Sequence, residues 1–319
     1  MEATPSSALD WVLDKSVELG YSAIGPALRR GWWPGDPPAG ALAGRTVVVT
    51  GGSGGLGLAA ATGLARLGAD VHLVGRSAER LEQARGAVLA GLPEASVHTA
   101  VCDVSDLEAV EAFCSDLDGR VGSLHALVHN AGVMPPRRML SAQGHELALA
   151  THVLGPHLMT FRLADALRGG RVVVVSSGGM YGQALPTSDP EYTHGTYSGV
   201  TAYARTKRMQ VVLAELWAEH LASRGITVAS MHPGWADTPG VTDSLPRFAR
   251  LMGPLLRSPE SGADTIVWLT AAPRELPTGL FWHDRRPRPT HYLPRRLEGE
   301  AEREALWAWV RAQTGQPPS

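Results

Sequence analysis

Several features that define other classes of protein are scarce or absent in this 319-residue sequence. Its two cysteines, Cys102 and Cys114, are too few for a disulfide framework and stand in no metal-ligand spacing, so we expect no metal site. The formal net charge of −2 argues against a basic field that binds nucleic acid. The sequence also shows no signal peptide and no run of about eighteen apolar residues, which favours a cytoplasmic protein without a membrane-spanning helix.

The sequence does contain a regular alternation of short apolar segments and longer helical patterns. Hydrophobic residues make up 44% of the chain, enough to form a full core. Continuous apolar strands that alternate with helices are typical of a parallel sheet covered on both faces. We therefore predict an α/β fold, a doubly wound, Rossmann-like parallel sheet in a single three-layer αβα domain. The predicted strands are 45–50, 70–74, 97–101, 124–128, 171–176, 226–231 and 279–282, and the predicted helices include 55–67, 107–117, 143–168, 200–223 and 259–271.

Both ends of the chain lie outside this alternation. We divide the chain into an amphipathic N-terminal extension and linker (1–40), the Rossmann-like domain (41–290) and a helical C-terminal tail (291–319). Apolar residues recur at helical spacing between 7 and 30, which indicates a helix broken near Gly25 and Pro26. This helix could pack on the domain. Alternatively, residues 7–33 could contact a membrane surface peripherally or border the substrate entrance.

Tyr203 and Lys207 stand four residues apart in the segment Tyr-Ala-Arg-Thr-Lys. One helical turn places the two side chains on the same face of the predicted helix. The lysine ammonium can stabilise a tyrosinate and lower the pKa of the phenol from its usual value of about 10. We therefore predict that Tyr203 donates and accepts the proton of a carbonyl/alcohol pair.

A glycine-rich turn follows the first predicted strand and leads directly into a helix. Glycines allow the backbone to approach a pyrophosphate, and the helix N-terminus favours its negative charge. A dinucleotide that carries hydride would complete the chemistry predicted for Tyr203. The spacing leaves two alternatives: Gly51, Gly55 and Gly57, or Gly51, Gly54 and Gly57. The residues expected to bind the cofactor in this turn are Gly51, Ser53, Gly54, Gly55, Leu56 and Gly57.

The next three strand ends supply further candidate cofactor contacts. Gly75 leaves space and Arg76 offers a guanidinium where an acidic residue would repel a 2′-phosphate, which favours NADP(H) over NAD(H). After the third strand, Asp103 either accepts a hydrogen bond from adenine or caps the next helix, and Val104 follows it. After the fourth strand, the small residues in Asn130-Ala131-Gly132 would let the cofactor pass close to the backbone.

Together these motifs resemble those of the short-chain dehydrogenase/reductase family over most of residues 45–283. The compact branch has Thr-Gly-x-x-x-Gly-x-Gly, Asn-Ala-Gly, a serine after the fifth strand, Tyr-x-x-x-Lys and a Pro-Gly turn. The resemblance implies an NAD(P)-dependent enzyme in which Ser177, rather than Ser176, donates a hydrogen bond to the substrate oxygen. It also implies that Lys207 holds the nicotinamide ribose. The residues implied to hold the nicotinamide itself are Pro233, Gly234 and Thr238.

Within this family, the sequence more closely resembles the dehydrogenase/reductase SDR family member 12 group, through segments such as 176–180, 230–240 and 283–287. It departs from the family at His152, where an asparagine usually steadies a water that relays protons to the lysine. A histidine titrates near neutral pH and can hold water with either ring nitrogen. His152 therefore either substitutes in the relay or marks a damaged relay. The second alternative would leave a dinucleotide-binding sensor or scaffold with little catalysis.

The expected substrate is a small carbonyl or alcohol. The apolar segment 235–256 either covers a lipophilic substrate or packs on the sheet, and the long loop 182–202 would border the site. Members of the resembled family often pair through helices flanking the fifth strand, so a homo-oligomer is compatible with the sequence unless the extension blocks it. A late basic stretch would touch anionic lipid or an acidic substrate group, or would be a solvated surface with a few ion pairs. Its arginines are Arg285, Arg286, Arg288, Arg295 and Arg296.

Overall fold

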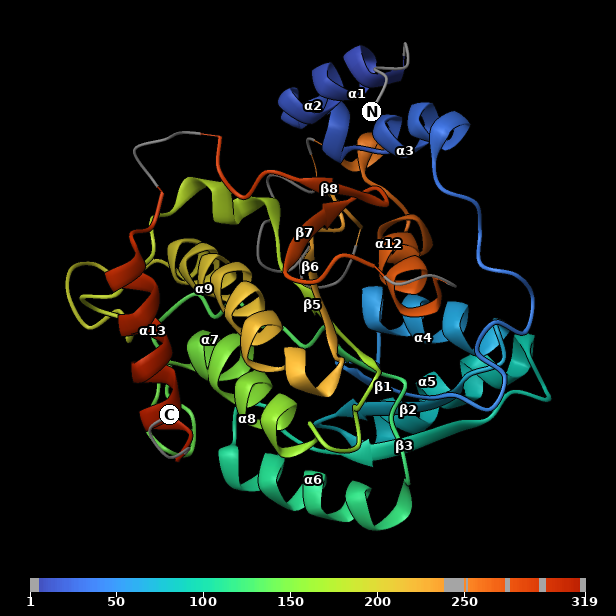
Figure 1. Ribbon diagram of the computed structural model, residues 1–319, viewed down its shortest axis with the longest axis horizontal. Coiled ribbons are helices and arrows are strands. Elements are labelled where there is room, and N and C mark those ends of the chain that lie inside the picture. The colour runs from blue at the N-terminus through green and yellow to red at the C-terminus, as the bar shows by residue number, and fades with distance from the viewer. Residues whose placement is uncertain (1–5, 238–249, 251, 273–275, 293–296, 316–319) are drawn as a thin grey trace.

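Valine-rich segments form the central strands, because β-branched side chains suit a sheet that is buried on both faces. A computed structural model describes residues 6–237, 250, 252–272, 276–292 and 297–315. The sheet has eight strands in the order β3-β2-β1-β4-β5-β6-β7-β8 (Figure 1). Strands β1 to β7 are parallel, which confirms the predicted doubly wound fold. The strands are β1 (Thr46–Thr50), β2 (Asp70–Gly75), β3 (Val97–Val101), β4 (Ala126–His129), β5 (Arg171–Val175), β6 (Thr227–Met231), β7 (Leu280–His283) and β8 (Arg286–Arg288).

Helices cover both faces of the sheet, and each face has its own core. Successive strand residues point to opposite faces, so Val47 and Val49 belong to one core and Val48 to the other. The first core is covered by α4 (Gly55–Arg66), α5 (Ala78–Gly91) and α12 (Pro259–Ala271). The second is covered by α6 (Leu107–Arg120), α8 (Gly155–Arg162), α9 (Gly199–His220) and α13 (Glu300–Gln313).

The strand order places a topological switch point between β1 and β4. Strand β1 pairs with β2 on one side and with β4 on the other, so the chain builds the sheet outward in both directions from here. Doubly wound sheets bind ligands outside the carboxyl ends of the strands at such a point. The glycine turn follows β1 and Asn130 follows β4, so both motifs lie at this place.

The helix predicted over 143–168 is shorter and is interrupted in the structure. It comprises α7 (Leu147–Leu149), a π-helical segment (Ala150–Leu154) and α8. The carboxylate of Glu146 accepts hydrogen bonds from the first amide groups of α7, which fixes where the helix begins. Short π-helical segments often occur at functional sites, and this one carries His152.

Strand β8 was not predicted, and it turns the end of the sheet into an antiparallel hairpin. It pairs with β7 through Phe281 and Arg288, Trp282 and Pro287, and His283 and Arg286. Asp284 and Arg285 form the turn with φ near 50° and 56°. An Asp tolerates this left-handed region better than most residues, and both turn side chains are held by buried ion pairs.

The N-terminal extension forms three short helices that lie beside the β7–β8 end of the sheet (Figure 1). These are α1 (Ser6–Lys15), α2 (Val17–Tyr21) and α3 (Ile24–Arg29). The helical pattern is interrupted at Ser16 and at Ser22, whereas Gly25 and Pro26 lie inside α3, so the predicted position of the break is wrong. Leu13 and Tyr21 are buried against the rest of the protein, as expected for an extension that packs on the domain. The three-part division of the chain remains a prediction.

A buried ion network fixes this extension to the far end of the chain. Arg29 pairs with Asp10 and with Asp284, and Asp284 also pairs with Arg257. Arg288 donates two hydrogen bonds to Asp10. We call Asp10, Arg29, Arg257, Asp284 and Arg288 the buried ion network. Of the basic stretch, Arg285 and Arg288 lie in mostly buried ion pairs, and Arg286 contacts Asp10 from a partly exposed position. The ion pairs expected for this stretch are therefore present, but Arg285 and Arg288 are buried rather than solvated. Arg295 and Arg296 lie outside the described residues.

The C-terminal helix α13 docks on the same molecule. Leu306, Trp307 and Val310 are buried in the core beneath α8 and α9. Arg303 pairs with Glu215 on α9, which orients the helix. No helix in the described part of the chain is long and apolar enough to cross a membrane.

Candidate active site

Helix α9 carries Tyr203 and Lys207 on its inner face. The hydroxyl of Ser198 caps the helix by accepting a hydrogen bond from the amide of Thr201. Lys207 is only 2% exposed, and its Nζ donates to the carbonyl of Val175 at 2.8 Å. The same Nζ lies 5.2 Å from the centre of the Tyr203 ring. The predicted pair is thus held together at the carboxyl end of β5.

Ser177 lies opposite Tyr203, immediately after β5. Its hydroxyl is near enough to the Tyr203 phenol to lower the pKa of that group, and it accepts a hydrogen bond from the amide of Gly179. The neighbouring Ser176 is buried and donates to the carbonyl of Lys207 at 2.9 Å, so it supports helix α9. The geometry favours Ser177 over Ser176 as the serine that faces the reacting group.

Burial shifts the pKa of both members of the Tyr203–Lys207 pair toward their neutral forms. It raises the pKa of Tyr203 above its usual value, while the Ser177 hydrogen bond opposes this change. It lowers the pKa of Lys207 to about 7. The expectation that Lys207 lowers the phenol pKa therefore does not hold for the protein as it stands. A buried amine without an anionic partner is neutral for much of its time, and a neutral amine cannot stabilise a tyrosinate.

His152 is fully buried next to this pair, with both ring nitrogens engaged. Its Nε2 accepts a hydrogen bond from the amide of Val133 at 2.9 Å, and its Nδ1 lies 2.7 Å from the Thr206 hydroxyl. The ring stands edge-on to Tyr203, with centroids 5.4 Å apart. Burial lowers the pKa of His152 well below its ordinary value, so the ring is neutral. It therefore serves as a fixed support, and neither nitrogen is available to hold a relay water.

Gln210 connects the His152 backbone to the Lys207 side chain through two direct hydrogen bonds. Its Nε2 donates to the His152 carbonyl at 2.8 Å, and its Oε1 accepts from Lys207 Nζ at 3.0 Å. The sequence analysis did not identify Gln210. It stands one helical turn after Lys207, and this spacing could have indicated a contact between the two side chains.

The glycine turn adopts the first of the two predicted spacings. Gly51 and Gly55 have φ near +66° and +53°, a region that disfavours residues with a side chain. A Cβ at Gly57 would lie 2.2 Å from the Gly51 carbonyl, so this position also requires glycine. Gly54 precedes α4 with extended backbone and has no side chain to cap the helix. The first amide groups of α4 therefore have no side-chain cap, and a helix N-terminus of this kind favours an anionic group such as a pyrophosphate.

Asn130 holds the glycine turn in place. Its Nδ2 donates to the carbonyls of Thr50 and Gly51, at 3.0 Å and 3.3 Å. The Thr50 hydroxyl in turn accepts from the amides of Asn130 and Ala131. A Cβ at Gly132 would lie 3.3 Å from His152 Nε2, so this glycine leaves room for the histidine. The Asn-Ala-Gly segment therefore holds the glycine turn in position and leaves room for His152.

Two arginines lie near the end of β2, where one was predicted. Arg76 is exposed directly after the strand. A Cβ built at Gly54 would lie 3.5 Å from an Arg80 guanidinium nitrogen, so Arg80 also reaches the glycine turn. Gly75 leaves space beside the Ser53 hydroxyl. Arg80 was missed in the sequence because it lies one turn inside helix α5, where a surface arginine is common.

Asp103 does not cap helix α6, so the capping alternative is wrong, and the contacts of Asp103 are local. Its Oδ1 accepts hydrogen bonds from the amide and the hydroxyl of Ser105, at 2.9 Å and 2.8 Å. Helix α6 itself is capped by Asp106. Val104 is buried in the core, and its carbonyl lies against Gly155. The side chain of Val104 is therefore part of the core, and its role toward a cofactor remains a prediction.

The Pro233–Gly234 turn is held by the N-terminal extension. The amide of Trp235 donates to the Tyr21 carbonyl at 2.8 Å, and Arg257 Nε donates to the same carbonyl at 2.9 Å. The Tyr21 ring covers Gly178, where a Cβ would lie 2.5 Å from it. Tyr21 and Arg257 carry no motif that would reveal this role in a sequence. Thr238 lies outside the described residues.

The long loop after Ser177 packs over the start of α7. The Glu191 carboxylate accepts from the Glu146 amide and lies 2.7 Å from His145 Nδ1. The Tyr197 hydroxyl donates to the Glu146 carboxylate. The predicted border loop over 182–202 thus contacts the start of α7, and the π-helical segment that carries His152 follows α7 directly. Of segment 235–256, residues 238–249 and 251 lie outside the described residues.

Comparisons with known proteins agree with this architecture. The family model for short chain dehydrogenase matches residues 45–247. Dehydrogenase/reductase SDR family member 12 from Bos taurus is 40% identical over 82% of this chain and 84% of its own length. Polyprenol dehydrogenase from Mus musculus is 35% identical over 72% of each chain. Retinol dehydrogenase 14 from Homo sapiens is 29% identical over 89% of this chain and 90% of its own.

Solved structures show the same fold. An uncharacterized protein from Mycobacterium paratuberculosis superimposes with a TM-score of 0.71 at 27% identity, covering 89% of this chain and 98% of that one. A structure from Beutenbergia cavernae, described as an NAD(P) dependent gluconate 5-dehydrogenase with bound NADP at low occupancy, has a TM-score of 0.59 at 25% identity. It covers 76% of this chain and 96% of its own.

The chain belongs to the short-chain dehydrogenase/reductase family, and it is an NAD(P)-dependent oxidoreductase of the carbonyl/alcohol type. Within the family it is similar to member 12, as its sequence predicted.

Proposed function

We propose that this protein interconverts a lipophilic carbonyl and its alcohol, with NADP(H) as the preferred cofactor and Tyr203 as the acid and base. The observation that carries this proposal is the cluster of Ser177, Tyr203 and Lys207 at the carboxyl end of β5. The cofactor supplies or accepts the hydride at the substrate carbon. The protein supplies the proton, the hydrogen bonds and the shape of the cleft.

In carbonyl reduction, the hydroxyls of Ser177 and Tyr203 hydrogen-bond to the substrate oxygen. As hydride reaches the carbon, the carbonyl π bond breaks and its electrons move to that oxygen, which takes the proton of Tyr203. Lys207 must then be charged to stabilise the phenolate, so its pKa has to rise above about 7 when anionic groups bind beside it. Alcohol oxidation is the reverse sequence, in which the phenolate removes the hydroxyl proton.

The preference for NADP(H) rests on the charge around the end of β2. Arg76 is exposed directly after β2, Arg80 reaches the glycine turn, and neither Gly75 nor Ser77 is acidic. A guanidinium can bind a 2′-phosphate through paired hydrogen bonds. These features favour the phosphorylated cofactor.

The proposed lipophilic substrate rests on relatives and on the surface of the extension. The names of polyprenol dehydrogenase and retinol dehydrogenase 14 describe lipophilic alcohols. In this chain, large apolar side chains are exposed on the helices that adjoin the site. They are Leu9, Trp11, Val12, Leu19 and Leu28, which we call the apolar surface of the extension. Such a surface supports the peripheral membrane contact proposed for residues 7–33.

Fluorescence titration with NADPH and NADH, followed by a panel of carbonyl compounds, tests this proposal. We expect tighter binding of NADPH than of NADH, and NADPH oxidation with at least one lipophilic aldehyde or ketone. An Arg76→Ser, Arg80→Ser variant should lose the preference while its affinity for NADH changes little. Tighter binding of NADH by the wild type would contradict the cofactor proposal.

His152 favours a second candidate, a dinucleotide-binding sensor with little catalysis. Its ring lies where the family has an asparagine, and both nitrogens are occupied within the protein. Under the main proposal, Gln210 replaces the relay water, so His152→Asn lowers the rate by removing a support. Under the sensor alternative, His152→Asn restores the family residue and raises a very low rate. The direction of the change in kcat separates the two.

A further inference from the structure

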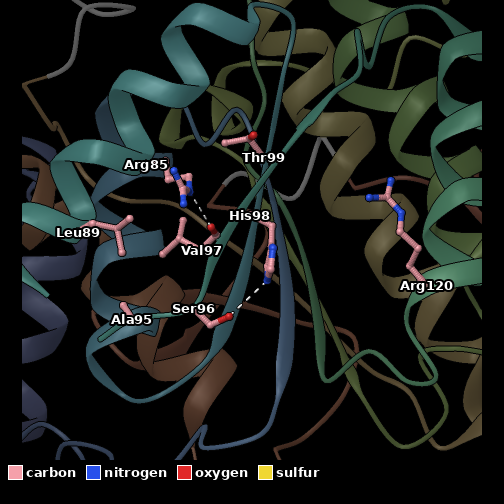
Figure 2. A pocket seen from close by; sticks show the side chains of 8 residues that line it. All are labelled: Arg85, Leu89, Ala95, Ser96, Val97, His98, Thr99 and Arg120. Atoms are coloured by element: carbon pink, nitrogen blue, oxygen red, sulfur yellow. Dashed lines mark hydrogen bonds between the residues drawn. The ribbon is translucent and has the colours of Figure 1, made fainter. Parts of the chain in front are cut away.

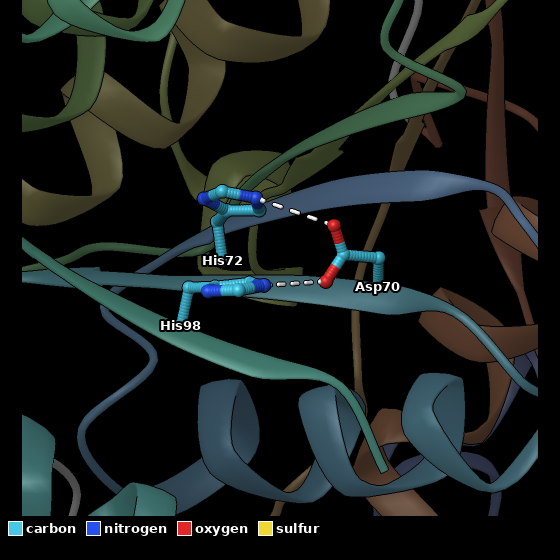
Figure 3. A group of neighbouring side chains, drawn as sticks. All are labelled: Asp70, His72 and His98. Carbon is cyan, nitrogen blue, oxygen red and sulfur yellow. Dashed lines mark ion pairs between the residues drawn. The ribbon is translucent and has the colours of Figure 1, made fainter. Parts of the chain in front are cut away.

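A cluster of metal-ligand side chains lies on β2 and β3, away from the catalytic residues. Asp70 and His72 are two residues apart on β2, so their side chains share one face of the sheet. His98 is the direct neighbour of His72 on β3 in the strand register. Figure 3 shows the two imidazole rings lying beside each other and the Asp70 carboxylate directed toward both. Asp70 begins its strand, so the cluster lies at the end of the sheet opposite the cofactor cleft.

The distances suit a small metal ion. Asp70 Oδ1 lies 2.8 Å from His98 Nε2, and Asp70 Oδ2 lies 3.6 Å from His72 Nε2. One ligand atom from each residue lies within 4.8 Å of the others. Tetrahedral bonds of about 2.0–2.1 Å place ligand atoms about 3.3 Å apart, so small side-chain rotations would bring all three to one ion.

The cluster is open to solvent on one side. The His98 side chain is 53% exposed and that of Asp70 32%, whereas His72 is mostly covered. His98 lines a hollow of about 460 Å³ beside β3. The Ser96 hydroxyl lies 3.2 Å from His98 Nε2, and Figure 2 shows it directed toward that ring. An ion could enter from this side, and water or Ser96 could complete its ligand shell.

The local charges permit a cation here. Asp70 supplies the negative charge, and each imidazole offers one ring nitrogen as a ligand atom. Arg120 lies close enough to repel a bound cation. Its guanidinium is paired with Asp116, however, one turn earlier on α6. Without an ion, the same residues would form an ordinary hydrogen-bonded surface cluster.

We propose that Asp70, His72 and His98 bind one divalent first-row transition-metal ion, such as Zn²⁺. Two imidazoles and one carboxylate favour zinc, copper, nickel or cobalt over magnesium and calcium, which prefer oxygen ligands. The ion would join β2 to the edge strand β3 and so stabilise that side of the sheet. Such a site would contradict our expectation from the sequence that the protein has no metal site, which considered only the two cysteines. Two histidines on separate strands have no recognisable spacing in a sequence.

Titration of the metal-free, full-length protein with Co²⁺, followed by its visible absorbance, tests the proposal directly. We expect saturation at one equivalent and competition by Zn²⁺. His98→Gln and Asp70→Asn should each weaken binding at least about 10-fold. His98 is exposed, so this substitution leaves the fold intact, which circular dichroism will verify.

His194→Gln is the matched control, because His194 is an exposed histidine beside a carboxylate, Asp189, at 3.5 Å. It should bind Co²⁺ as the wild type does. Absence of saturable binding in the wild type would overturn the proposal, as would equal affinity in His98→Gln and His194→Gln. The readout is metal binding, so failure of the proposed enzymatic function would not affect it.

Discussion

Lys207 is a buried cation whose environment decides when it is charged. Its Nζ has two oxygen acceptors, from Val175 and Gln210, and no carboxylate is among these contacts. Neutral acceptors compensate only part of the loss of water, so burial lowers the pKa of Lys207 to about 7. The residue can therefore change charge near neutral pH. Both the stability of the protein and its rate of turnover should therefore depend on pH in this range.

The stability of the cofactor-free protein should rise with pH because of Lys207. Between about pH 7 and the ordinary lysine pKa of about 10.4, the unfolded chain binds the proton and the folded chain does not. The free energy of unfolding therefore increases with pH in this window. From pH 7.5 to pH 9, wild type should gain roughly 2 kcal/mol relative to Lys207→Met. Urea unfolding of both proteins measures the difference, and parallel pH profiles would contradict it.

Gln210 should position Lys207 during turnover. In Gln210→Leu the charged lysine loses an acceptor, so its pKa falls further and the alkaline limb of the kcat profile should move to lower pH. Gln210→Glu keeps an acceptor and adds a negative charge, so the limb should move to higher pH. A role in packing alone would change kcat without moving either limb. Steady-state rates across pH, at saturating NADPH, distinguish these outcomes.

At the scale of elements, the parallel sheet and its crossing helices follow from local sequence, whereas the contacts between distant segments do not. Runs such as Val47 to Val49 predict buried strands, and the glycine turn predicts the cleft. Strand β8 was missed because Pro287 and two arginines give no strand signal. The extension's place beside the Pro233–Gly234 turn was missed as well. It depends on Arg29 meeting Asp284, and charged residues give no periodic signal of burial.

Arg257, within the buried ion network, should contribute much more to stability than Arg286, which contacts the network from a partly exposed position. Arg257 is buried and pairs with Asp284 while donating to backbone carbonyls of the extension. Arg257→Met leaves a buried carboxylate partly unpaired, which should lower the free energy of unfolding by about 3–5 kcal/mol. Arg286 contacts Asp10 from a partly exposed position, so Arg286→Met should change stability by less than about 1 kcal/mol. Equal losses in urea unfolding would contradict this picture.

At the scale of the whole molecule, the extension completes the domain and also presents an apolar surface. Tyr21 and Arg29 are buried parts of the structure, so deletion of residues 1–40 would expose their partners and damage the fold. Substitutions on the exposed side test its function without this complication. Trp11 is 62% exposed and is the largest side chain on that side.

Trp11→Ser combined with Leu9→Ser should weaken co-sedimentation with lipid vesicles while leaving thermal stability nearly unchanged. Exposed aromatic and aliphatic side chains supply much of the free energy of interfacial binding. Val101→Ser is the control, because Val101 is equally exposed but lies on β3, far along the sheet from the extension. Equal vesicle binding by both variants and wild type would remove the proposed membrane contact.

The central claim is that Tyr203 transfers the proton in an NADPH-dependent carbonyl reduction. The most direct test compares wild type with Tyr203→Phe, using the best carbonyl substrate and following NADPH oxidation together with NADPH binding. The account predicts that kcat falls by about 10²–10⁴-fold while the NADPH dissociation constant stays nearly the same, because only the hydroxyl is lost. Turnover retained by Tyr203→Phe would contradict it.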